Sequence, residues 1–73
     1  MTFNELWKRV SELGVLPDTA ILQIPFVLSQ QTKTKLTKNS PEEAAKIISS
    51  AIDEINRGSV ETVDTLVLRK LKK

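Results

Sequence analysis

Residues 40–58 read SPEEAAKIISSAIDEINRG, and this stretch specifies a helix with both of its ends. Ser40 is a preferred capping residue, Pro41 suits the first helical position, and Glu43 completes a capping box. Apolar residues then recur at steps of three and four, which makes one broad face of the helix apolar. The closing glycine suits the left-handed conformation that ends many helices. The stretch therefore predicts a helix over residues 41–57, against which the rest of the chain packs.

Two further amphipathic segments flank this central one. The same periodicity predicts a first helix over residues 3–13 and a last helix over residues 60–71. Thr2 and Ser59 are their expected caps. The first apolar stripe consists of Phe3, Leu6, Trp7, Val10 and Leu13, and the last consists of Val60, Val63, Leu66, Val67 and Leu71. Because Trp7 lies on such a stripe, we expect it in the core.

The segment from residue 15 to residue 38 is harder to interpret. Pro25 lacks a backbone N–H and disfavours helical geometry in the residue before it, so we expect a break there. This predicts two short helices, over residues 18–24 and 25–36. The pattern leaves open whether they form two helices or one bent helix. A strand at residues 21–28 is an alternative for which the chain offers no evident partner.

These segments together predict an all-α fold, in which one small domain of residues 1–73 holds four to five short helices. The chain is 40% hydrophobic and 27% charged, which is typical of a globular protein rather than a disordered one. A chain of 73 residues buries a modest core, so its stability should be only a few kcal/mol (roughly 3–5) unless association adds to it.

The composition leaves few groups for catalysis. The chain has no cysteine and no histidine, which removes thiolate chemistry, the usual proton shuttle near neutral pH and the commonest metal ligand. Its two isolated glycines do not form a phosphate-binding loop. The acidic pairs Glu42/Glu43 and Asp53/Glu54 fit a helix start and a solvated helix face better than acid–base catalysis. We therefore expect a protein that is not an enzyme and has no cofactor or metal.

The longest apolar region, residues 15–28, does not suit a membrane. Two prolines and several polar residues interrupt it, so it should not span a bilayer. The first ten residues form an amphipathic pattern rather than a signal sequence. We expect a soluble cytoplasmic protein that does not act at a membrane.

The same apolar region carries the main functional hypothesis. Nine of its fourteen residues are apolar, and a small bundle covers only one side of such a helix. The uncovered side would then be a docking surface for a protein partner or for a second copy of the chain. The residues assigned to this surface are Ile21, Leu22, Ile24, Phe26 and Val27. The alternative is that a kink at Pro25 turns both halves toward the core.

A nucleic-acid-binding regulator is the second functional hypothesis. Residues 12–21 resemble the turn of a helix-turn-helix motif, although the helix that follows carries no basic residue. Two basic clusters would have to supply the contacts to phosphate. They consist of Lys33, Lys35 and Lys38, and of Arg69, Lys70, Lys72 and Lys73. The net charge of +2 is too small to argue for nucleic acid by itself, and the sequence does not show whether the clusters meet in space.

Overall fold

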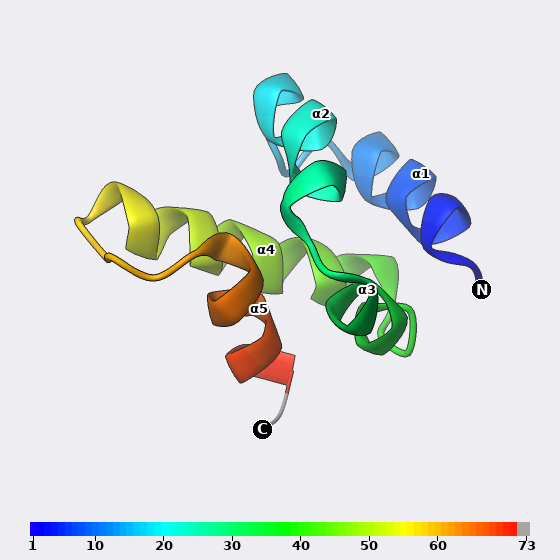
Figure 1. Ribbon diagram of the computed structural model, residues 1–73. Helices are drawn as coiled ribbons and strands as arrows, with labels where there is room; N and C mark the ends of the chain where they lie inside the picture. Colours follow the sequence, from blue (N-terminus) through cyan, green and yellow to red (C-terminus); the bar gives the residue numbers. More distant parts are fainter. Residues whose placement is uncertain (72–73) are drawn as a thin grey trace.

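The computed structural model describes residues 1–71 and confirms the all-α prediction. Within that range the chain forms five α-helices and no strand (Figure 1). The helices are α1 (Phe3–Leu13), α2 (Asp18–Val27), α3 (Gln30–Leu36), α4 (Pro41–Asn56) and α5 (Val63–Leu71). The longest of them, α4, crosses the middle of the molecule and contacts α1 and α5.

The core lies where the apolar faces of the five helices meet. Fourteen hydrophobic residues are buried in one cluster, and α4 contributes its small residues as well as an isoleucine. The buried set is Leu6, Trp7, Val10, Leu16, Ala20, Ile24, Leu28, Leu36, Ala44, Ala45, Ile48, Ala51, Leu66 and Val67. The three alanines give α4 a slim face, which lets neighbouring helices approach it closely. The expectation that Trp7 belongs to the core is confirmed.

Both ends of α4 follow from the local sequence. The Ser40 side chain accepts a hydrogen bond from the Glu43 backbone N–H, and Pro41 occupies the first helical position. At the other end Gly58 has a positive φ of 100°, a conformation that costs glycine little. The helix ends at Asn56, and Arg57 is its C-cap.

The ends of α1 also agree with the prediction. Thr2 and Glu5 form a complete capping box, in which each side chain accepts a hydrogen bond from the backbone N–H of the other residue. Gly14 ends the helix with a φ of 69°. A left-handed residue at this point stops the helix and starts the turn that leads into α2.

The predicted break at Pro25 is wrong. Helix α2 continues through Pro25 to Val27, and the break lies at Leu28 and Ser29. The extended backbone at Leu28 and the side chain of Ser29, which accepts a hydrogen bond from the backbone N–H of Thr32, separate α2 from α3. Residues 15–38 therefore contain two helices, but the first ends at residue 27 rather than at residue 24.

The start of the last helix also differs from the prediction. Helix α5 begins at Val63 rather than at residue 60, and Thr62 takes the place expected for Ser59. The Thr62 hydroxyl accepts a hydrogen bond from the Thr65 backbone N–H, and its carbonyl accepts one from Leu66. Ser59 instead accepts a hydrogen bond from Glu61 within the preceding turn. Val60 is consequently exposed in this connection and does not belong to the helix stripe.

The cap of α4 gives a direct test of this account. Replacing Ser40 with alanine leaves the Glu43 N–H without its side-chain acceptor, so the free energy of unfolding should fall by about 1 kcal/mol. Urea denaturation followed by circular dichroism measures this change. Ser50→Ala is the control, because Ser50 lies in the middle of the same helix, where alanine has the higher helix propensity. An equal loss in both variants would contradict the capping role.

Candidate interaction surface

Helix α2 carries more exposed large hydrophobic side chains than any other helix of the described residues. Phe26 is 89% exposed, Leu22 is 70% exposed and Val27 is 50% exposed. Two other members of the predicted surface do not share this exposure. Ile24 is only 4% exposed and belongs to the core, which corrects its assignment, and Ile21 is partly buried against the core. The candidate surface therefore consists of Leu22, Phe26 and Val27.

A hydrogen bond from α1 fixes the orientation of α2. In a regular helix the N–H of residue 25 would bond to the carbonyl of Ile21, but Pro25 has no N–H to donate. The indole Nε1–H of Trp7 donates to that Ile21 carbonyl instead, at 2.9 Å. The proline therefore leaves no unsatisfied carbonyl, and the helix continues through it. Since this contact holds the inner side of α2 toward α1, Leu22 and Phe26 remain on the outside.

Phe3, which stacks on this tryptophan, connects α1 to α3. The two rings have centroids 5.6 Å apart and an angle of 17° between their planes. On α3, the Lys33 ammonium lies 5.2 Å from the centre of the Phe3 ring, within the range of a cation–π contact. Contacts of Trp7 and Phe3 thus join α1, α2 and α3.

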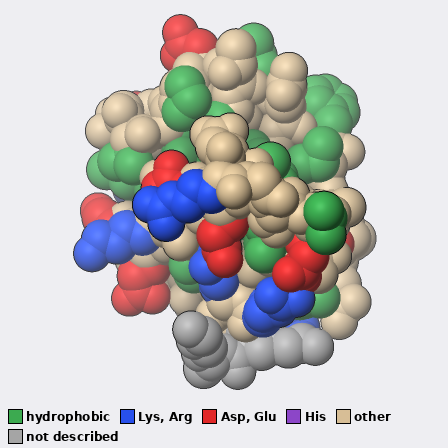
Figure 2. Space-filling model, turned by 90° about the vertical axis from the view of Figure 1, so that its left-hand side faces the viewer, with side chains coloured by type: hydrophobic (Ala, Val, Ile, Leu, Met, Phe, Trp, Pro, Cys, Tyr) green, Lys and Arg blue, Asp and Glu red, His purple; other side chains and the backbone are tan. Residues whose placement is uncertain are grey.

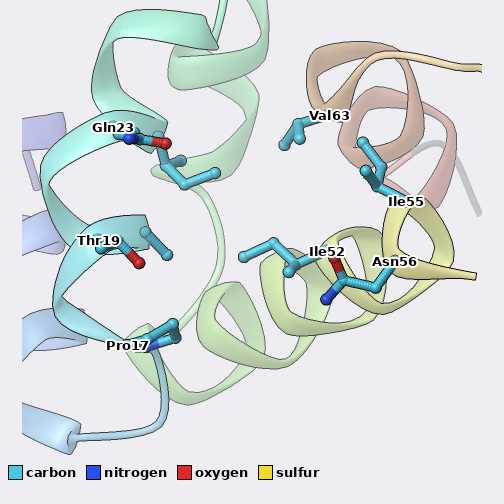
Figure 3. Close-up of a pocket in the computed structure, with 9 residues that line it drawn as sticks. Pro17, Thr19, Gln23, Ile52, Ile55, Asn56 and Val63 are labelled. Carbon is cyan, nitrogen blue, oxygen red and sulfur yellow. The ribbon is translucent and has the colours of Figure 1, made fainter.

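An open groove borders the candidate surface. It lies between α2 on one side and the end of α4 with the start of α5 on the other, and its volume is about 300 Å³ (Figure 3). The lining residues are Pro17, Thr19, Ala20, Gln23, Ile24, Ile52, Ile55, Asn56 and Val63. In the close-up, Thr19 and Gln23 on α2 lie across the groove from Ile52, Asn56 and Val63. The groove therefore has an apolar floor and a polar rim without charged groups.

A polar contact holds α5 against α3. The backbone N–H of Ser29 donates to the Asp64 carboxylate at 2.7 Å, and the buried Thr32 hydroxyl lies 3.0 Å from the hydroxyl of Ser29. Partial burial raises the pKa of Asp64, but hydrogen bonds from the Ser29 backbone and from the Thr32 and Ser29 hydroxyls outweigh it. The pKa of Asp64 is therefore lower than its ordinary value of 3.8.

Ion pairs engage two residues of the C-terminal basic cluster. Arg69 pairs with Glu61, and the Lys70 ammonium lies 2.7 Å from the Glu54 carboxylate. The hydrogen bond from Lys70 lowers the pKa of Glu54. The other two members of this cluster, Lys72 and Lys73, lie outside the described residues.

The basic cluster of Lys33, Lys35 and Lys38 lies on and just after α3. Lys33 and Lys35 are partly buried and Lys38 is exposed. Lys33 faces the Phe3 ring of α1, whereas Lys70 faces Glu54 of α4. Figure 2 shows acidic and basic side chains interspersed on the face it presents, with hydrophobic side chains gathered toward its upper part.

Metal-binding clusters and membrane-spanning helices are two further features by which a function can be recognised. Among residues 1–71, no three acidic side chains are grouped in a way that could hold a metal ion. None of the helices in this range has the length and apolar character needed to cross a membrane. Comparisons with models of known families, with curated proteins and with solved structures find no match to this chain.

The Asp64 contact predicts a dependence of stability on pH. Because the folded pKa of Asp64 lies below its unfolded value, its contribution to stability is present above about pH 4. This contribution is lost as the pH falls through the lower, folded pKa. In urea denaturation at pH 7 and pH 2.5, Asp64→Asn should lose less stability on acidification than the wild type.

The exposed Asp53 on α4 provides the matched control. Asp53→Asn removes a carboxylate outside the contact between α3 and α5, so it should retain the wild-type loss of stability on acidification. If Asp64→Asn lost as much stability as the wild type, the contact with Ser29 would not be the source of the effect.

Proposed function

We propose that this protein is a non-enzymatic interaction module that self-associates through the outer face of α2. The observation that carries the proposal is the exposure of Phe26 and Leu22, which lie one helical turn apart and form a continuous apolar strip. Exposed apolar side chains gathered in this way are typical of interaction sites rather than of an inert surface. Aromatic residues in particular contribute much of the binding energy at protein interfaces.

The distribution of charge favours a second copy as the partner. The chain carries a net charge of +2, so two copies repel each other weakly at long range. However, the fourteen residues from Thr19 to Thr32 include no charged side chain. Two copies that meet through residues 19–32 therefore bring no like charges together. A symmetric contact uses the same apolar patch on both chains, which is the usual arrangement in homodimers.

Nucleic-acid binding has less support. The helix that follows the turn at Gly14 exposes Leu22 and Phe26 rather than basic side chains. Arg69 and Lys70 are already engaged with carboxylates, which reduces the positive charge that they offer to phosphate. No contact among the described residues favours this function over self-association.

Sedimentation equilibrium at several protein concentrations and two salt concentrations tests the proposal. We expect a dimer whose dissociation constant changes little or falls as salt increases, because apolar association does not depend on counterion release. Phe26→Glu and Leu22→Glu should each weaken the dimer at least about 30-fold, which corresponds to about 2 kcal/mol. Helicity should be retained, since both side chains are exposed.

Thr34→Glu is the control for added charge, because it introduces the same carboxylate at an exposed position on α3. It should leave the dimer intact. A monomer at every concentration, or a dimer that tolerates both α2 variants, would contradict the proposed function. Loss of helicity in Phe26→Glu would show instead that this side chain contributes to folding.

A further inference from the structure

We infer that the groove beside α2 is the receptor for Phe26 of a second copy, so that each chain of the dimer inserts Phe26 into the groove of the other. This inference rests on the proposed function and names the contact that would give the dimer its affinity. It concerns the groove residues rather than the outer strip of α2, so it can fail while self-association through α2 still holds.

The position of Phe26 places it beside the groove but not inside it. Phe26 follows Gln23 by three residues and Thr19 by seven, so the three residues share one stripe of α2. Thr19 and Gln23 form the rim of the groove (Figure 3). The side chain of Phe26 is nevertheless almost fully exposed, which shows that it does not fill the groove of its own chain.

The size and chemistry of the groove suit a phenyl ring. Its volume of about 300 Å³ is larger than one aromatic side chain. Ile52, Ile55 and Val63 are partly buried at its floor, where a ring would cover the apolar surface that remains exposed. The rim residues Thr19, Gln23 and Asn56 are neutral, so insertion of an apolar group displaces water without desolvating a charge.

The area that a stable dimer needs also points to the groove. The outer face of a ten-residue helix measures about 15 Å by 10 Å, which is far less than the roughly 800 Å² that each partner buries in a standard interface. A contact between the two α2 helices alone would therefore bury only part of the area of a standard interface. The groove is apolar surface that adjoins this face, and in a reciprocal contact each chain would cover the groove of the other.

Nuclear magnetic resonance on a mixed sample tests the inference. One half of the protein carries ¹³C-labelled isoleucine and valine methyl groups, and the other half is unlabelled. We expect intermolecular NOEs from the ring of Phe26 to the methyl groups of Ile52, Ile55 and Val63. In Phe26→Leu these NOEs should disappear, and the upfield ring-current shifts of the methyl groups on dimerisation should be lost.

A second variant tests the groove from its other side. Asn56→Trp places a large ring at the exposed rim on α4 and should weaken the dimer at least about tenfold, whereas Ser50→Trp at an exposed position of α4 should not. A dimer that is disrupted by Leu22→Glu but shows no NOE between Phe26 and the groove would overturn the inference and leave the proposed function standing. A chain that remains a monomer would overturn both.

Discussion

The arrangement of α1 and α2 depends on the hydrogen bond from the Trp7 indole to the carbonyl of Ile21. Pro25 would otherwise leave that carbonyl without its helical partner, at a position where the surrounding side chains limit access to water. The contact has three consequences. It lets α2 continue to Val27, it directs Ile24 into the core, and it leaves Phe26 on the outside. A proline that would usually interrupt a helix is thus accommodated by a side chain from another helix.

The elements that depend on local sequence could be predicted. The capping box of Thr2 and Glu5 and the cap at Ser40 are formed by residues close together in the chain, so α1 has its predicted bounds and α4 begins where expected. The all-α class followed from the spacing of the apolar residues at steps of three and four. The cap expected at Ser59 is wrong: the hydroxyls of both Ser59 and Thr62 accept a backbone hydrogen bond, but only that of Thr62 starts a helix.

The interior of α2 could not be predicted in the same way, because its continuation through Pro25 depends on a tryptophan in another helix. The break assumed at Pro25 also concealed a signal. Ala20, Ile24 and Leu28 recur every four residues and are all buried, but this spacing reaches Leu28 as one face only if the helix passes through the proline. That face identifies Ile24 as a core residue and separates it from Leu22 and Phe26. The groove was missed because its lining comes from three segments that are distant in the sequence.

The measurement that tests this account most directly is a double-mutant cycle between Trp7→Phe and Pro25→Ala, read by urea denaturation. With Pro25 in place, Trp7→Phe leaves the Ile21 carbonyl without a donor. In the Pro25→Ala background, the restored N–H can take the place of the indole. The account predicts that Trp7→Phe costs about 1 kcal/mol less when residue 25 is alanine, while the packing lost with the indole is the same in both backgrounds. Costs that agree within about 0.3 kcal/mol would contradict it, since the two residues would then act independently.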